Sequence, residues 1–171
     1  MKIEEDNNFS SLIFLKYILF SEYKKNIKLK EIIYGEYKKP YHNDFYFNIS
    51  HSKNYICVAI GEKELGIDIE EERKYVHNFE RKVFSKKDFE LGISNVIETW
   101  VIKEAYSKYK GKGLLIKFSD ISVEDIRSEC YLYDLSNKNY YCYVAGEEKI
   151  ENIKTIDYKL FKKYLKNEVK I

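Results

Sequence analysis

The spacing of apolar residues predicts several helices. Over residues 12–19 apolar side chains recur at helical spacing, and Ser10 or Ser11 is placed to cap that helix. The clearest helical pattern covers residues 94–110 and ends at Gly111, because glycine readily adopts the left-handed conformation that ends a helix. Shorter helices are predicted over residues 79–84 and around residues 158–165. A third short helix is predicted to begin at a capping box formed by Ser85 and Asp88.

Short runs of β-branched and aromatic residues predict strands. Three runs, at residues 45–50, 55–60 and 65–69, precede the long helix, and the segment 61–63 predicts a hairpin turn between the last two. The runs predicted after the long helix cover residues 118–123, 130–135, 140–145 and 153–156. This mixture of helices and short strands indicates an α+β fold.

One segment of the chain is echoed in its second half. Residues 53–63 match residues 138–148 at six of eleven positions, at a constant offset of 85. A chain this rich in Lys, Asn, Tyr and Glu matches itself to some extent by composition alone. The shared strand-then-turn pattern nevertheless favours a duplicated αβ lobe, with residues 1–92 as the first lobe and 93–171 as the second. At the same offset Asp68 corresponds to Ile153, so a charged site is expected in one half only, facing the cleft between the lobes.

Composition excludes some classes of protein. Hydrophobic residues make up 44% of the chain, which is enough for a sizeable core. The 30 Lys and Arg residues nearly balance the 28 Asp and Glu residues, and this balance argues against nucleic-acid binding. The apolar run at residues 11–20 is about half the length that spans a bilayer. Three widely spaced cysteines and an acidic, polar beginning favour a cytoplasmic protein.

Two carboxylates alternate with apolar residues in the run Gly66-Ile67-Asp68-Ile69-Glu70. Side chains on a strand alternate between its two faces, so Asp68 and Glu70 share one face. A divalent cation relieves the repulsion between two nearby carboxylates, and Mg²⁺, or Mn²⁺ in its place, suits such oxygen ligands. The alternative interpretation is a strand end with a solvated acidic face.

A second polar group lies on the predicted long helix. Trp100, Glu104 and Lys108 are successive i, i+4 neighbours and form one stripe, which Lys103 flanks. By itself this stripe is equally typical of a surface ion pair between Glu104 and Lys108.

A third polar group is the turn Ser50-His51-Ser52, which follows a predicted strand. Its hydroxyls, imidazole and backbone N–H groups can bind phosphate oxygens, although an exposed polar turn has the same composition. A Ser/His/Asp hydrolase is disfavoured because the chain contains no GxSxG nucleophile elbow.

The three groups in order resemble one family. The chain has Phe-Asn-Ile-Ser-His-Ser, then Gly-Ile-Asp-Ile-Glu, then Trp-x-x-Lys-Glu-Ala-x-x-Lys-x-x-Gly-x-Gly-Leu at residues 100–114. Together with Val83-Phe84-Ser85, this order is similar to the phosphopantetheinyl transferase superfamily, specifically its larger type that activates peptide synthetases. The family fold implies two similar αβ lobes related by pseudo-twofold symmetry, each a small antiparallel sheet packed with a long helix, with the active site in the cleft between them.

The resemblance also implies an activity and roles for individual residues. The expected enzyme transfers 4'-phosphopantetheine from coenzyme A to a serine of an acyl or peptidyl carrier protein, as a monomer. Glu104 and Lys108 are the expected catalytic residues, with Glu104 accepting the serine proton. Mg²⁺ is expected to bind to Asp68, Glu70 and Glu104. The phosphates of coenzyme A are expected to contact Ser50, His51, Lys103 and Lys108. The nucleotide is expected to lie against Lys39 and Pro40.

Two alternatives and one departure accompany this interpretation. A catalytically idle relative that only binds carrier protein or coenzyme A is possible on the same motifs. The small trimeric holo-synthase type shares Gly-x-Asp and Trp-x-x-Lys-Glu-Ala, but it carries the first of these at its extreme N-terminus. The chain also begins close to its first helix, whereas relatives of the larger type have basic residues there that hold the 3'-phosphate of coenzyme A. Weak discrimination between coenzyme A and its 3'-dephospho form is therefore expected.

Overall fold

The computed structural model describes residues 7–35, 37–75, 78–112, 115–154, 156, 161, 163 and 164. Residue contacts divide the chain into two compact units, one made of Met1–Ile32 with Ile150–Ile171 and the other of Ile33–Lys149. The two predicted lobes, residues 1–92 and 93–171, are divided differently and stay a prediction. Within the described residues, no helix is long and apolar enough to cross a membrane.

The smaller unit contains helix α1 (Asn7–Tyr23) and the 3-10 turn Leu29–Glu31. The predicted first helix is confirmed, with Leu15 and Leu19 buried as its apolar spacing requires. The predicted cap at Ser10 or Ser11 is wrong, because the helix already begins at Asn7. Ile13 packs against Phe161, which the structure describes as helical together with Lys163 and Tyr164. The rest of the helix predicted over residues 158–165 lies outside the described residues, and the described residues 153, 154 and 156 form no strand.

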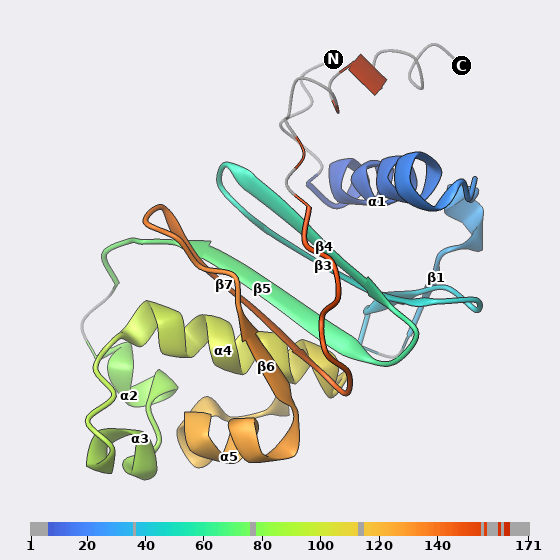
Figure 1. The fold of residues 1–171 in the computed structure, drawn as a ribbon. Coiled ribbons are helices and arrows are strands. Elements are labelled where there is room, and N and C mark those ends of the chain that lie inside the picture. Colours follow the sequence, from blue (N-terminus) through green and yellow to red (C-terminus); the bar gives the residue numbers. More distant parts are fainter. Residues whose placement is uncertain are drawn as a thin grey trace. The chain divides into compact units, whose positions relative to one another are not determined.

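The larger unit holds small antiparallel sheets and the helices that cover one of them (Figure 1). Strand β5 (Leu65–Glu71) pairs with β7 (Tyr140–Gly146), whose other edge pairs with β6 (Tyr131–Asp134). Strand β3 (Tyr46–Ser52) pairs with β4 (Tyr55–Gly61), and the short strands β1 (Ile33–Tyr34) and β2 (Pro40–Tyr41) pair with each other. The α+β class with small antiparallel sheets is therefore confirmed.

The hairpin predicted between residues 55–60 and 65–69 is wrong, because β4 pairs with β3 instead of β5. The free edge of β5, where β4 was expected to pair, is bound by side chains of β3. The Ile67 N–H donates to Asn48 Oδ1 at 2.8 Å, and the Glu71 N–H donates to Ser52 Oγ at 3.3 Å. These bonds satisfy β5 backbone groups that would otherwise need another strand.

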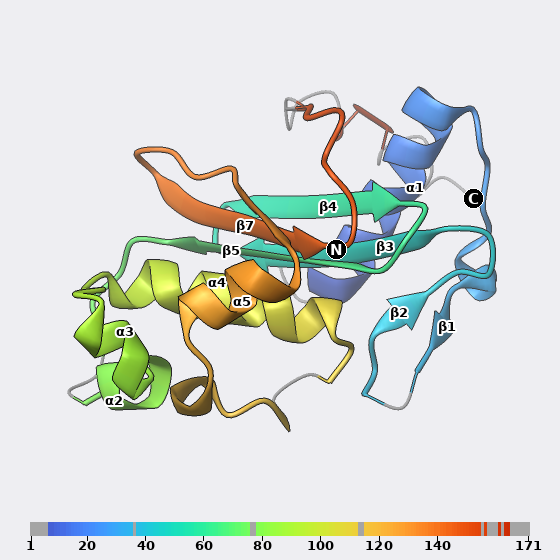
Figure 2. The same cartoon turned by 60° about the horizontal axis from the view of Figure 1, so that its bottom comes forward.

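Helix α4 (Val96–Tyr109) is the long helix that the sequence predicts. Asn95 caps its beginning by accepting from the Glu98 N–H, and Gly111 has a left-handed φ of 65° just past its end. Figures 1 and 2 show α4 on one face of the β5–β7–β6 sheet, together with α5 (Val123–Glu129). The core between these elements is built from Val101, Ile102, Ala105, Tyr106, Val123, Ile126, Tyr143 and Ala145.

The segments flanking α4 contain one confirmed and one wrong prediction. The predicted capping box begins α3 (Lys86–Glu90), because Ser85 Oγ accepts from the Asp88 N–H; the short helix α2 (Glu80–Val83) precedes it. The strand predicted at residues 118–123 is instead a 3-10 turn followed by α5. A second capping box causes this, since the Asp125 N–H donates to Ser122 Oγ at 3.0 Å.

The internal echo extends to strand pairing. Tyr46 pairs with Gly61 in the β3–β4 hairpin, and Tyr131 pairs with Gly146 in the β6–β7 hairpin, so both registers agree at the offset of 85. Equivalent residues of the two hairpins also meet. The rings of Tyr55 and Tyr140 lie 4.7 Å apart between centroids, and the Sγ atoms of Cys57 and Cys142 lie 3.9 Å apart.

Candidate active site

The beginning of β5 lies directly against the backbone of α4, and Gly66 makes this approach possible. A Cβ atom at this position would lie 2.2 Å from the Ala105 carbonyl oxygen and 2.3 Å from the Tyr109 nitrogen. No side chain fits in that space, so only glycine allows the strand to reach the helix. The contact brings the carboxylates that follow Gly66 on β5 beside the last turns of α4.

Asp68 is the most enclosed carboxylate of this region, with only 6% of its surface exposed. Its Oδ1 accepts from Lys108 Nζ at 2.6 Å and from Ser50 Oγ at 2.8 Å. The other oxygen, Oδ2, is buried and has no hydrogen-bond partner within the described structure. A buried carboxylate oxygen without a partner is costly, so this atom is suited to a cation that the fold itself does not supply.

Lys108 connects the end of α4 to β3 and β5. Besides Asp68, its Nζ donates to Ser50 Oγ and to the Ile67 carbonyl oxygen, both at 3.1 Å. The three N–H bonds of the Lys108 ammonium group thus each have an acceptor, and together they fix this group beside the Asp68 carboxylate. The structure therefore brings Ser50, Asp68 and Lys108 together.

Glu70 and Glu104 complete the acidic group. Glu70 accepts from Ser52 Oγ at 2.9 Å and from Arg73 at 3.2 Å. The Glu104 side chain is half-buried, and its carboxylate makes no hydrogen bond within the described structure. Burial raises the pKa of Glu104, the negative charges of Asp68 and Glu70 raise it further, and Lys108 acts in the opposite direction. Glu104 thus lies close enough to Asp68 and Glu70 for their negative charges to repel its own.

The residues present fit a hard divalent cation such as Mg²⁺. They supply carboxylate oxygens only, their charges repel one another, and Asp68 Oδ2 lacks a partner. Among the described residues, no three acidic, histidine or cysteine side chains already stand in a ligand arrangement. The Lys108 ammonium group instead neutralises Asp68.

His51 lies at an open cavity beside these carboxylates. The cavity has a volume of about 370 Å³ and is lined by His51, Ser52, Lys53, Glu70, Glu71, Glu72 and Arg73. Its lining carries both signs of charge, and His51 is exposed and free to meet a ligand from solvent.

Comparison with known proteins shows the family of this chain. The sequence model of the 4'-phosphopantetheinyl transferase superfamily matches residues 64–160, more than half of the chain, including β5, α4 and β7. The chain belongs to the 4'-phosphopantetheinyl transferase superfamily.

Individual relatives of this superfamily match shorter stretches. The 4'-phosphopantetheinyl transferase gsp of Aneurinibacillus migulanus is 30% identical over 103 residues, which cover 56% of this chain and 44% of the relative. The 4'-phosphopantetheinyl transferase Sfp of Bacillus subtilis (strain 168) is 28% identical over 113 residues, covering 61% and 50%. The chain thus matches about half the length of these curated relatives or less.

One superfamily motif residue has a different place from the one expected. Lys103 is completely buried, and its Nζ donates to Asp88 Oδ2 at 2.5 Å and to the carbonyl oxygens of Val83 and Phe118. The expectation that it contacts coenzyme A phosphates is therefore corrected. Burial lowers the pKa of Lys103, and the hydrogen bond and charge of Asp88 oppose this effect.

Asp88 is the residue that sequence reasoning missed. Its capping box with Ser85 was predicted, but not its role as the buried partner of a lysine 15 positions later. Burial raises the pKa of Asp88, but hydrogen bonds from Lys103 and from the Val123 and Ser85 N–H groups bring it below its usual value. This pair ties α3, α4 and the beginning of α5 together.

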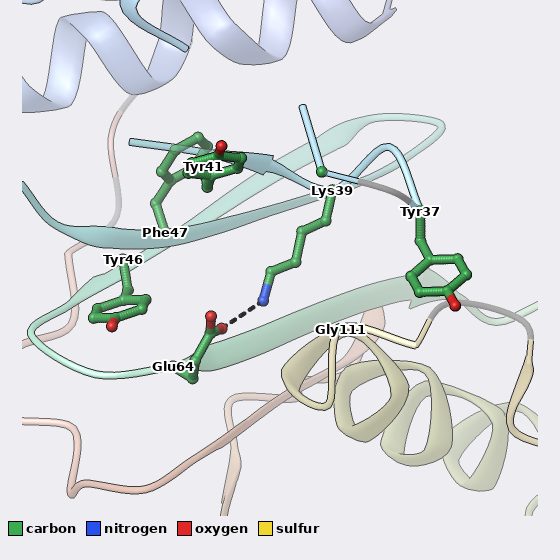
Figure 3. Close-up of a pocket in the computed structure, with 8 residues that line it drawn as sticks. Tyr37, Lys39, Tyr41, Tyr46, Phe47, Glu64 and Gly111 are labelled. Carbon is green, nitrogen blue, oxygen red and sulfur yellow. Dashed lines mark hydrogen bonds and ion pairs between the residues drawn. The ribbon is translucent and has the colours of Figure 1, made fainter. Parts of the chain in front are cut away.

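Lys39 and Pro40 lie apart from the carboxylates, at the β1–β2 hairpin. Lys39 Nζ donates to Glu64 Oε2 at 2.7 Å, to the Lys108 carbonyl oxygen at 2.9 Å and to the Leu65 carbonyl oxygen at 3.3 Å. Figure 3 shows this lysine pointing toward Glu64 in a pocket of about 190 Å³. The pocket is lined by Gly35, Tyr37, Lys39, Tyr41, Tyr46, Phe47, Glu64 and Gly111.

Proposed function

We propose that this protein transfers 4'-phosphopantetheine from coenzyme A to a serine of an acyl or peptidyl carrier protein. The observation that carries the proposal is the buried Asp68, which holds Lys108 with one oxygen while the other has no partner, in a chain that belongs to this superfamily. The relatives named above are all 4'-phosphopantetheinyl transferases.

The transfer is a phosphoryl-type substitution. The carrier serine oxygen forms a bond to the β-phosphorus of coenzyme A, the bond from that phosphorus to the bridging oxygen breaks, and 3',5'-adenosine bisphosphate leaves. Such reactions depend chiefly on positioning and on neutralising charge. Mg²⁺, or Mn²⁺ in its place, would be held by Asp68, Glu70 and Glu104 and would supply positive charge to the pyrophosphate.

The chain's own side chains would do the rest. His51, which is exposed at the open cavity, binds a phosphate oxygen through its imidazole. Ser50 was also expected to contact a phosphate, but its one hydroxyl proton already goes to Asp68, so its role is to hold Asp68 and Lys108 in place. Lys108 offsets negative charge that develops on the pyrophosphate. Glu104 accepts the proton of the carrier serine, directly or through a water molecule.

The proposal also includes the arrangement around the site. We infer that two similar αβ lobes, related by a pseudo-twofold axis, face each other across the site, with β5 from the first and α4 from the second. The shared register of the two hairpins supports this, as do the contacts of Tyr55 with Tyr140 and of Cys57 with Cys142, since equivalent residues meet near a twofold axis. A monomer in the cytoplasm, with its three cysteines free, completes the proposal.

The test is the intact mass of an apo carrier protein after incubation with the chain, coenzyme A and Mg²⁺. We expect the mass to rise by one phosphopantetheine group. Glu104→Gln should slow the transfer by about 100-fold or more while coenzyme A binding stays measurable. Glu62→Gln, which changes an exposed turn residue, is the matched control and should transfer at the normal rate. An unmodified carrier, with coenzyme A bound, would refute the proposed activity.

A further inference from the structure

Lys39 has no donor left for a ligand. Its ammonium group carries three N–H bonds, and the structure gives it three acceptors: the Glu64 carboxylate and the carbonyl oxygens of Leu65 and Lys108. The side chain is only 20% exposed, and its charge is matched by Glu64. A nucleotide phosphate would have to replace contacts that already satisfy this lysine.

The two carbonyl groups that Lys39 binds lie on either side of the contact between Gly66 on β5 and the end of α4. Leu65 precedes Gly66 on β5, and the Lys108 carbonyl carbon would be 2.8 Å from a Cβ atom placed on Gly66. At this point strand and helix meet backbone to backbone, without a side chain from β5 to interlock them. Lys39 reaches in from the β1–β2 hairpin and holds both backbones at once. Its positive charge also suits the negative end of a helix dipole, and the Lys108 carbonyl oxygen accepts from the Gly111 N–H at 3.1 Å as well.

The contact that Lys39 holds is the one that positions Lys108. The Lys108 side chain reaches across the same contact to the Ile67 carbonyl oxygen and to Asp68 Oδ1. A displacement of the helix end relative to β5 would move that ammonium group away from Asp68. We infer that Lys39 is a positioning residue that clamps Leu65 to Lys108 and so holds Lys108 on Asp68, and that it is not a ligand of the nucleotide. This inference rests on the proposed function only for its catalytic consequence.

The test compares Lys39→Met with Lys38→Met, which removes a neighbouring exposed lysine. In Lys39→Met, the amides of residues 65–67 and 105–109 should exchange hydrogen about tenfold faster than in the wild type, because the local contact opens more often. The dissociation constant of coenzyme A should stay within about threefold, and kcat should fall about tenfold or more, since small displacements at a reacting site are costly. Lys38→Met should change none of these, and Lys39→Arg should restore part of kcat.

A second variant keeps the inference testable if Lys39→Met does not fold. Glu64→Gln removes the charge that pairs with Lys39 and so weakens one of its three contacts. If Lys39 is a clamp, the same amides should exchange faster and coenzyme A affinity should not increase. If Lys39 is a nucleotide ligand instead, Glu64→Gln frees it and tightens coenzyme A binding. Unchanged exchange in both variants, or a loss of coenzyme A affinity of tenfold or more in a folded Lys39→Met, would overturn the inference. Exchange and binding decide this even if the wild-type chain transfers nothing, an outcome that would refute only the proposed function.

Discussion

At the scale of single residues, two lysines of one helix have opposite environments. Lys103 is fully buried with its charge paired to Asp88, whereas Lys108 lies at the surface of the candidate site on Asp68. The motif Lys-Glu-Ala-x-x-Lys indicates that both are notable, but not which of them faces inward. That depends on how α4 is turned against β5 and α5, which is a matter of tertiary packing and not of residue type.

Replacing Lys103 by Met should destabilise the fold strongly. The substitution leaves the Asp88 carboxylate buried without its cation, and breaking a buried pair in this way costs about 3–5 kcal/mol. Denaturant unfolding measures this loss. Lys87→Met, which removes an exposed lysine paired with Glu124 and Asp125, is the control and should leave the unfolding midpoint nearly unchanged. Equal midpoints for the two variants would argue against a structural role for Lys103.

At the scale of elements, most helices and strands of the larger unit could be predicted, but their pairing could not. The run at residues 65–69 is a strand as its alternation indicates, yet its partner is β7, about 75 residues later, instead of the neighbouring β4. Local patterns report which face of a strand is apolar. They do not report that Asn48 and Ser52 bind the free edge of β5, because such bonds depend on the register between segments.

The close approach of β5 to α4 predicts a strong effect of one methyl group. Gly66→Ala places Cβ 2.2 Å from the Ala105 carbonyl oxygen, far inside van der Waals contact. The strand or the helix must therefore move. We expect a loss of about 3 kcal/mol in the free energy of unfolding, the upper part of the usual overpacking range. Gly35→Ala is the matched control, because its Cβ meets only the Lys39 carbonyl oxygen at an ordinary 3.7 Å. If both variants unfold at the same denaturant concentration, the described contact is wrong.

At the scale of the whole molecule, the candidate site is assembled from segments far apart in sequence. Ser50 on β3, Asp68 on β5 and Lys108 on α4 meet within hydrogen-bonding distance. The order of the motifs, which resembles that of the superfamily, predicts that these residues belong together. The clamp at Lys39 and the buried pair at Lys103 could not be predicted in this way, since both depend on which acceptors the folded backbone presents.

The most direct test of the central claim is a titration of Mg²⁺ into the chain in the presence of coenzyme A, followed by calorimetry. The wild type and Glu62→Gln should bind the ion alike. Asp68→Asn, which removes the charge of the most buried carboxylate, should bind it about tenfold more weakly or worse. Equal affinity of Asp68→Asn and the wild type for Mg²⁺ would contradict a metal site built on Asp68, Glu70 and Glu104.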